Sequence, residues 1–467
     1  MFYFYIIYSL ILFVTRNVPH NVHYTATSYC HRGHSKCATL QCLKMSAGLT
    51  TELPPETDSL FSATVSAADS ATHLTVGAPG PSLLAALPPL FQEAATHFLG
   101  GQATNPHMFQ YGPELGTATF RHELAAFLSR RYGDPVAADQ LVLTTGATNG
   151  LHLVTSRLVR PGGVVFVENP TYFIALNLLS GDMGLEVVPV DMLRDGVDIA
   201  ALERSVERAA AGRSVETEAE RHWGVIYTIP TFHNPTGVTL GRQRGEQLIA
   251  VARRWNLLVV CDDVYNLLSY SPLAVSRLKT LDTAPGGLVI SNGSFSKILA
   301  PGVRLGWLEA PPRLVAALAS SGVLLSGGSQ NNVMSGLVTS LLSLGHLDTL
   351  LDTAIATYSQ RMEAAVSILQ SGLPASWSVL NPRGGYFLWI ETDIEDLKGF
   401  VSWLRTKKKI LVMHGSHASP NTHLERREEN CCMNSFRVSI AYYDLPKLEY
   451  ACNDLCSAAK EYFVQTT

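Results

Sequence analysis

The chain has 467 residues, of which 46% are hydrophobic and 16% are charged, and its formal net charge is −4 at pH 7. The composition is typical of a well-buried globular protein, and the length allows two or three domains or one large and one smaller unit. It excludes the basic surface of a nucleic-acid-binding protein, because the one basic run, Lys407–Lys409, is more simply a solvated helix end. The eight cysteines follow neither a disulfide framework nor a metal-ligand spacing. We therefore expect no metal site and a reducing, cytoplasmic location.

The first 44 residues differ in composition from the rest of the chain. Phe2–Val14 is an apolar run that is too short to span a bilayer and lacks the positively charged start of a secretory signal. Residues 15–44 contain histidines and cysteines but no acidic residue. A mitochondrial transit peptide, a Cys/His metal-binding tract, or a disordered or mis-annotated extension before Met45 would each fit. We expect no stable membrane insertion, and we treat residues 1–50 as an atypical extension, disordered or targeting.

From Leu74 onward, short apolar runs alternate with segments of helical periodicity. The runs predicted as strands are Leu141–Leu143, Val164–Val167, Val187–Val190, Val225–Tyr227, Leu257–Val260 and Leu288–Ile290. Helices are predicted at about Pro113–Arg131, Thr148–Leu158, Gly241–Trp255 and Thr353–Gln370. Strands that are apolar throughout are typical of a mostly parallel sheet covered on both faces. The pattern therefore predicts an α/β fold, in which ligands bind beyond the carboxyl ends of the strands.

After about Gly345 the pattern changes from α/β to α+β. A long helix precedes the strand-like segments Trp377–Leu380, Gly384–Ile390 and Phe436–Ile440, which indicates a second, smaller domain. We predict an N-terminal arm and part of the small domain at residues 51–104, a large domain at 105–345 and the C-terminal small domain at 346–467. His414–Asn430, rich in His, Ser, Pro and charge, is expected to be a flexible surface loop.

The most informative segment is Ser294–Lys297, followed across a Pro-Gly turn by Arg304. Hydroxyl groups and a guanidinium suit a phosphate, and a desolvated lysine amine beside them suits a Schiff base. That combination is what a pyridoxal phosphate (PLP) enzyme needs. The alternative is a surface loop with a solvated lysine.

Two further motifs follow predicted strands. Thr144–Gly150 opens a helix, so its backbone N–H groups can approach an anion, although a turn with a helix cap explains it as well. In the turn Asn234–Gly237, the Asn234 amide can donate to a phenolic oxygen.

Three charged residues in or directly after buried strands also require partners. Asp262 and Asp263 follow a buried strand, where a carboxylate is costly unless it is paired with a group such as a pyridinium nitrogen. The alternative for both is a helix N-cap. Tyr265, three residues after Asp262, could hydrogen-bond the hydroxyl of such a ring. Arg437, in an apolar strand, suits a substrate α-carboxylate, with a structural salt bridge as the alternative.

The order of these motifs resembles the class I/II aminotransferases of PLP fold type I, and most closely the 2-aminoadipate, kynurenine and aromatic aminotransferase branch. The motifs, in chain order, are Gly-Ala-Thr, Pro-Thr-Tyr, Asn-Pro-Thr-Gly, Asp-Asp-Val-Tyr, Ser-Phe-Ser-Lys with Pro-Gly-Val-Arg, and Asn-Ser-Phe-Arg. The resemblance covers roughly Leu74–Phe463. It implies a large domain with a mostly parallel seven-stranded sheet between helices, plus a smaller α+β domain.

The resemblance implies a role for each residue around the cofactor ring. Lys297 would hold PLP as a Schiff base and then act as the base that moves the substrate's α-proton. Asp262 would pair the ring nitrogen, Asn234 and Tyr265 would bond the ring oxygen, and Tyr172 would stack on the ring face.

It also implies the phosphate and substrate contacts. The residues implied to hold the phosphate are Ala147, Thr148, Ser294, Ser296 and Arg304. Tyr111 would reach the phosphate of a neighbouring subunit, which implies a homodimer with shared active sites. Arg437 would bind the α-carboxylate, and Gly77 would line the substrate entrance. No second arginine for a side-chain carboxylate can be matched.

The leading hypothesis is transfer of an amino group between an L-amino acid, aromatic, 2-aminoadipate-like or broad in range, and a 2-oxo acid. A second hypothesis is another PLP reaction on the same fold, catalysed by a lyase or a cyclising synthase, because the same carbanion can react in several ways. A third is a non-catalytic PLP-binding regulator. No DNA-binding domain can be recognised before Leu74, which disfavours the third hypothesis.

Overall fold

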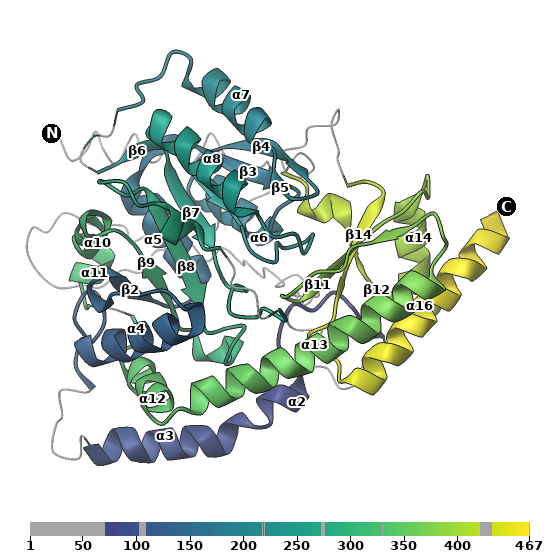
Figure 1. Ribbon diagram of the computed structural model, residues 1–467, viewed down its shortest axis with the longest axis horizontal. Coiled ribbons are helices and arrows are strands. Elements are labelled where there is room, and N and C mark those ends of the chain that lie inside the picture. Colours follow the sequence, from purple (N-terminus) through teal and green to yellow (C-terminus); the bar gives the residue numbers. More distant parts are fainter. Residues whose placement is uncertain are drawn as a thin grey trace, which may run out of the picture. The chain divides into compact units, whose positions relative to one another are not determined.

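The computed structural model describes residues 71–101, 109–216, 218, 220–271, 276–328, 330–420 and 432–466. The predictions made for residues 1–50, and for residues 51–70 and 102–104 of the arm, lie outside these residues. All described residues belong to one compact unit, Leu60–Thr467. Within it, strands form a large sheet, a smaller antiparallel sheet and a short parallel pair (Figure 1).

The large sheet contains eight strands in the order β2-β9-β8-β7-β6-β3-β4-β5. The strands are β2 (Leu141–Thr144), β3 (Val159–Asn169), β4 (Glu186–Leu193), β5 (Gly196–Val197), β6 (His222–Thr228), β7 (Leu258–Asp262), β8 (Val289–Ser294) and β9 (Gly306–Glu309). Strands β4, β3, β6, β7 and β8 are parallel, whereas β9 is antiparallel to both of its neighbours and β5 to β4. The predicted mostly parallel α/β sheet is confirmed. The resemblance implied seven strands, whereas the sheet has eight, and neither β5 nor β9 was among the six apolar runs predicted as strands.

Both faces of this sheet are buried, and the alternation of side chains along β3 shows how. Val165 and Val167 pack in a cluster with residues of α5 (Ala147–Leu158) and α10 (Pro312–Ala319). Val164 and Phe166 point the other way, into a cluster with residues of α7 (Ile199–Ala210) and α8 (Arg242–Arg254). Because successive strand residues face opposite sides, burial of both faces requires the continuous apolar runs seen in the sequence.

Every predicted strand of the large sheet lies within or overlaps an observed one, but one helix begins later than predicted. The segment predicted as helical from Pro113 becomes α4 only at Ala118, and the helix ends at Tyr132. Thr117 caps it by accepting a hydrogen bond from Phe120 N at 3.3 Å, and Gly116 before it has φ of +90°. The chain turns at Gly116, directly before this cap, so the helix cannot begin as early as Pro113.

The remaining helices either lie beside the large sheet or follow it in sequence. They are α2 (Pro81–Leu84), α3 (Leu87–Gly101), α6 (Phe173–Leu176), α9 (Leu278–Leu281), α11 (Gly322–Leu325), α12 (Asn332–Ser343), α13 (His346–Gly372), α14 (Leu397–Trp403) and α16 (Leu445–Thr466). The longer helices that were not predicted are α3, α7, α10, α12 and α16. No single helix among the described residues is long and apolar enough to cross a membrane, and only the pair α12 and α13, bent by 78°, passes that test together.

The smaller sheet is antiparallel and has the order β10-β11-β14-β13. Its strands are β10 (Ser378–Val379), β11 (Phe387–Glu391), β13 (Met413–His414) and β14 (Ser435–Ser439). The long helices α13 and α16 lie side by side along it (Figure 1). The α+β pattern predicted for the C-terminal part is therefore present, whereas the predicted domain boundaries stay a prediction. A separate parallel pair joins β1 (Thr72–His73) to β12 (Ile410–Leu411).

The prediction of a flexible surface loop at His414–Asn430 is wrong for its first part. His414 begins a buried stretch that continues as a short helix at Gly415–Ala418. The polar side chains there bond one another: His414 Nδ1 lies 2.8 Å from Ser416 Oγ and accepts from Ser416 N at 3.0 Å. Thr171 N donates to Ala418 O at 2.8 Å, which fixes the segment against the end of β3. Residues 421–430 lie outside the described residues.

Candidate active site

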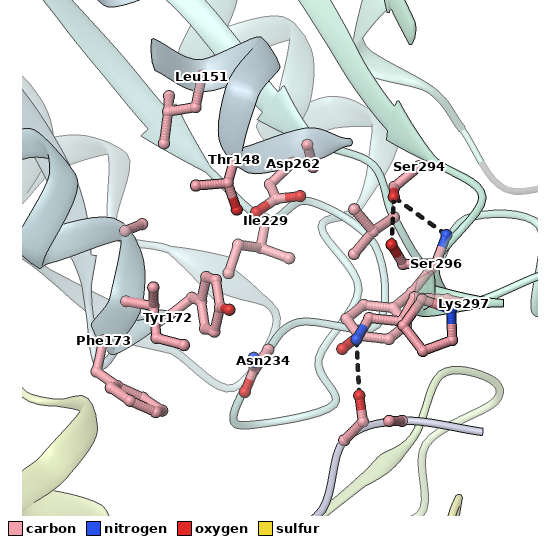
Figure 2. A pocket seen from close by; sticks show the side chains of 18 of the residues that line it. Thr148, Leu151, Tyr172, Phe173, Ile229, Asn234, Asp262, Ser294, Ser296 and Lys297 are labelled. Carbon is pink, nitrogen blue, oxygen red and sulfur yellow. Dashed lines mark hydrogen bonds between the residues drawn. The ribbon is translucent and has the colours of Figure 1, made fainter. Parts of the chain in front are cut away.

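A cavity of about 580 Å³ lies at the carboxyl ends of the parallel strands (Figure 2). Every predicted site residue except Tyr111 lines it. These residues are Gly77, Ala147, Thr148, Tyr172, Asn234, Asp262, Tyr265, Ser294, Ser296, Lys297, Arg304 and Arg437. Residues far apart in sequence therefore meet at the edge of the sheet where ligands of α/β proteins bind.

Lys297 lies in the turn that follows β8, with its amine inside the cavity. Its Nζ donates to Gly77 O at 2.7 Å (Figure 2). Burial lowers the pKa of this amine to about 8, and the cations Arg437 and Arg304 act in the same direction while Asp262 opposes them. Its backbone is fixed as well, because Tyr386 Oη donates to Lys297 O at 2.7 Å. The alternative of a solvated surface lysine is therefore wrong.

Asp262 ends β7 with one carboxylate oxygen paired and the other free. Tyr227 Oη donates to Asp262 Oδ2 at 2.6 Å, whereas Oδ1 is buried without a hydrogen-bond partner among the described residues. Burial raises the pKa of this carboxyl to about 6, against the opposing effect of the Tyr227 hydrogen bond. A buried carboxylate oxygen of this kind requires a donor, and a protonated ring nitrogen is one.

The alternative role of Asp262 and Asp263 as helix N-caps is wrong. Residues 264–267 form a turn and not a helix. Asp263 instead accepts a hydrogen bond from Ser291 Oγ on β8. Burial raises the pKa of Asp263 to about 6 as well, and Asp263 does not line the cavity.

One end of the cavity is built to hold an anion. Helix α5 begins at Ala147 after Gly146, whose φ of +105° suits glycine, and no side chain caps its first N–H groups. A Cβ on Gly146 would lie 3.3 Å from Arg304 Nη2, so the guanidinium lies close against this helix start. Ser294 Oγ donates to Ser296 Oγ at 3.0 Å on the same side (Figure 2). Free N–H groups, hydroxyls and a guanidinium together suit a phosphate.

Arg437 reaches the opposite side of the cavity from β14. Its Nη1 donates to Asn234 Oδ1 at 2.8 Å and its Nη2 to Thr75 O at 2.7 Å, while Nε is buried without a partner. Its guanidinium lies 4.0 Å above the ring of Phe387. Burial lowers its pKa to about 10, so it stays a cation at neutral pH. No carboxylate among the described residues pairs with it, and the alternative of a structural salt bridge is not supported there.

Of the three tyrosines predicted for the site, two line the cavity and one does not. Tyr172 lines the cavity beside α6, and burial raises its pKa to about 12 (Figure 2). Tyr265 is 3% exposed and its ring meets Tyr386 and Phe387 edge to face. Tyr111, in contrast, is 82% exposed and outside the cavity of its own chain.

Sequence reasoning missed several residues that line the cavity. They are Thr75, Val76, Ala78, Leu151, Phe173, Ile174, Ala175, Leu178, Tyr227, Ile229, Val264, Pro301, Gly302 and Phe387. Tyr227 had a usable signal, because it is a polar aromatic near the carboxyl end of an apolar predicted strand. Thr75 and Phe387 had no such signal in the sequence. Their positions at the cavity depend on contacts with residues that lie hundreds of positions away or belong to another sheet.

The residues present fit pyridoxal phosphate. The anion site at α5 would bind the phosphate, and the free Oδ1 of Asp262 would accept a hydrogen bond from the ring nitrogen. Lys297 would bond to the aldehyde carbon. Because Asn234 Oδ1 already accepts from Arg437, the amide nitrogen of Asn234 is left to donate to the ring oxygen.

Known proteins with related sequences are aminotransferases and regulators. The family model for aminotransferase class I and II matches residues 79–455. An aromatic-amino-acid aminotransferase of Thermococcus litoralis is 32% identical over 283 residues, which are 60% of this chain and 64% of that protein. The chain thus spans somewhat less than two thirds of this relative. A protein of Bacillus subtilis described as an uncharacterized HTH-type transcriptional regulator is 27% identical over 369 residues, 78% of this chain and 70% of that protein.

Solved structures agree with these relatives. The kynurenine aminotransferase of Pyrococcus horikoshii, crystallised in complex with PMP, matches with a TM-score of 0.73 at 26% identity, over 86% of this chain and 93% of that one. The predicted fold type I architecture and the resemblance are confirmed. The chain belongs to the class I and II aminotransferase family, whose cofactor is pyridoxal phosphate.

Proposed function

We propose that this protein transfers an amino group between an L-amino acid and a 2-oxo acid. The observation that carries the proposal is the convergence of Lys297, Asp262 and Arg437 on one cavity, where Asp262 Oδ1 has no hydrogen-bond partner and Arg437 has no carboxylate partner among the described residues. A desolvated lysine amine, a buried carboxylate oxygen without a donor and a buried guanidinium without a carboxylate are the groups that bind an aldehyde cofactor and an amino acid together.

Bound pyridoxal phosphate supplies an electron sink for the negative charge that develops at the substrate's α-carbon. Arg437 binds the α-carboxylate and so orients the α-carbon toward Lys297. Lys297 Nζ would act as the general base that takes up the α-proton, and its lowered pKa of about 8 leaves part of the amine neutral near neutral pH. Asp262 would face the ring nitrogen as an anion, Asn234 and Tyr265 would hold the ring oxygen, and Tyr172 would cover the ring face.

The substrate side chain we propose is uncharged, either aromatic or aliphatic. Of the described residues that line the cavity, the cations are Lys297, Arg304 and Arg437, and all three already have partners in this scheme. The wall beside Tyr172 is apolar and comes from α6 and the π-helix Asn177–Asp182 that continues it, through Phe173, Ile174, Ala175 and Leu178. Such a wall favours burial of an apolar side chain over a second carboxylate.

We also propose a homodimer in which Tyr111 enters the partner's site. Supporting observations are the exposed apolar side chains near it: Phe109 is 68% exposed, and Val323, Leu325 and Val333 are also exposed. The segment that holds Tyr111 packs on the segment after α11, since a Cβ on Gly327 would lie 3.2 Å from the Tyr111 ring. Exposed apolar groups gathered in this way mark a surface that another chain covers. Sedimentation of the purified protein, together with the cofactor affinity of Tyr111→Ala, tests this arrangement.

The test of the function is a spectral half-reaction. The PLP-loaded protein should lose the absorbance of the lysine-bound cofactor when phenylalanine is added without an acceptor, and should recover it when a 2-oxo acid follows. Release of ammonia without an acceptor would instead identify a lyase. A stable spectrum with every amino acid tested would favour a cofactor-binding regulator, the alternative that the Bacillus subtilis relative supports.

A further inference from the structure

Tyr227 lies beside the site without a role in the scheme above. It is 1% exposed, belongs to β6 and lines the cavity. Its backbone pairs with Val260 of β7, two residues before Asp262, so both side chains lie on the same face of the sheet. The phenol oxygen lies 2.6 Å from Asp262 Oδ2.

The direction of this hydrogen bond is determined by chemistry. Burial and the neighbouring Asp262 hold the pKa of the Tyr227 phenol well above its ordinary value, so the phenol remains a donor. A carboxylate accepts through both oxygens, whereas a protonated acid has one oxygen that carries the hydrogen. The bond therefore favours the ionised form of Asp262 and fixes which of its oxygens stays free.

Other polar groups near Tyr227 are already paired and do not compete for its phenol. Glu168 accepts from Thr228 Oγ1 at 2.5 Å and from Ile229 N at 2.9 Å, and it lies 3.1 Å from His233 Nε2. Asp263 bonds Ser291. The phenol of Tyr227 thus has the carboxylate of Asp262 as its partner among the described residues.

We propose that Tyr227 is a positioning residue that holds Asp262 Oδ2, so that Oδ1 is aimed as an anion at the ring nitrogen of bound pyridoxal phosphate. The proposal rests on the cofactor placement given under the proposed function. It concerns the binding of the ring and not the turnover of any one amino acid.

Loss of the Tyr227 hydroxyl should weaken only the contact between Asp262 and the ring nitrogen. Without the phenol, the carboxyl group can rotate and take up a proton, so its bond to the ring nitrogen weakens. A cofactor analogue in which carbon replaces the ring nitrogen has no such bond to lose. Contacts made by the phosphate, the ring oxygen and Lys297 stay the same for both compounds.

The test is the dissociation constant of each compound, measured by fluorescence titration of the cofactor-free protein. Tyr227→Phe should weaken the binding of pyridoxal phosphate by roughly ten- to a hundredfold, the effect expected when a hydrogen bond to a charged group is lost. It should leave binding of the carbon analogue unchanged. Tyr132→Phe is the matched control, because Tyr132 Oη also has a polar partner, Asn266 Oδ1 at 3.3 Å, but does not line the cavity. This control should change neither constant.

Two results would overturn the proposal: unchanged binding of pyridoxal phosphate by Tyr227→Phe, or an equal loss for both compounds, which would mean a merely structural role. If Tyr227→Phe does not fold, Tyr227→Leu removes the same hydroxyl and must show the same selective loss. In the background Asp262→Asn, Tyr227→Phe should cause no further loss. A wild-type protein that binds pyridoxal phosphate but does not transaminate would refute the proposed function and leave this binding test intact.

Discussion

Replacement of Arg437 by alanine should raise the Michaelis constant for the amino acid far more than it lowers the stability of the fold. Arg437 is 3% exposed, and the described residues supply it with an amide and a carbonyl oxygen but no carboxylate. The charge partner proposed for it is the substrate's α-carboxylate. Truncation of one partner of a buried charge pair costs about 2–5 kcal/mol, which corresponds to a rise of roughly 30- to 5,000-fold in the Michaelis constant.

Part of the cost is structural, and the assay can separate it. Asn234 Oδ1 and Thr75 O each lose a hydrogen bond in the variant, at about 1 kcal/mol apiece. The half-reaction should be measured with phenylalanine and with phenethylamine, which lacks the carboxylate. The ratio of the activity with phenylalanine to the activity with phenethylamine should be much smaller in the variant than in the wild type. If both compounds lose equally, Arg437 acts only by holding Asn234 and Thr75, and the reasoning is refuted.

Three further predictions follow from particular contacts. The rate at which the cofactor-free protein captures pyridoxal phosphate should rise through a pH of about 8, because only the neutral Lys297 amine attacks the aldehyde; a rate that still rises above about pH 10 would indicate an ordinary lysine. In the cofactor-free protein, Asp262 of the folded state keeps its proton up to a pH of about 6, whereas Asp262 of the unfolded chain releases it near pH 3.8. The contribution of Asp262 to the free energy of unfolding therefore falls as the pH rises from 3.8 to about 6. Asp262→Asn should therefore reduce the loss of stability between pH 4 and 7 by about 3 kcal/mol in denaturant titrations, and an unchanged pH dependence would contradict the raised pKa. Gly384→Ala should destabilise the fold by about 1–3 kcal/mol, since its Cβ would lie 2.3 Å from the Phe232 ring and 2.5 Å from Leu268 O, whereas Gly181→Ala meets nothing within 4 Å and should change little.

The sequence was sufficient to predict six of the eight strands of the large sheet, all but β5 and β9, and the polar residues at the ends of the parallel strands. Buried parallel strands need continuous apolar runs, so Asp262 and the lysine turn after β8 stood out as polar groups that require a partner. The place of each in the cavity follows directly, because the carboxyl ends of parallel strands share one edge of the sheet.

What the sequence did not predict depends on contacts between distant segments. The bond from Arg437 to Thr75 joins residues 362 positions apart, and Tyr386 meets the backbone of Lys297 across 89 positions. The burial of His414 was missed because its polar neighbours satisfy one another, and this cannot be read from their composition. The late start of α4 depended on one capping hydroxyl, that of Thr117.

The central claim is that Lys297 binds pyridoxal phosphate covalently and passes an amino group through it. The most direct measurement is the absorption spectrum of the PLP-loaded protein beside those of Lys297→Ala and of Lys398→Ala, an exposed lysine as control. The wild type and the control should show the band of the lysine-bound cofactor near the edge of the visible range, lose it with an amino acid and regain it with a 2-oxo acid, whereas Lys297→Ala should lack the band. A band of wild-type strength in Lys297→Ala would contradict the account.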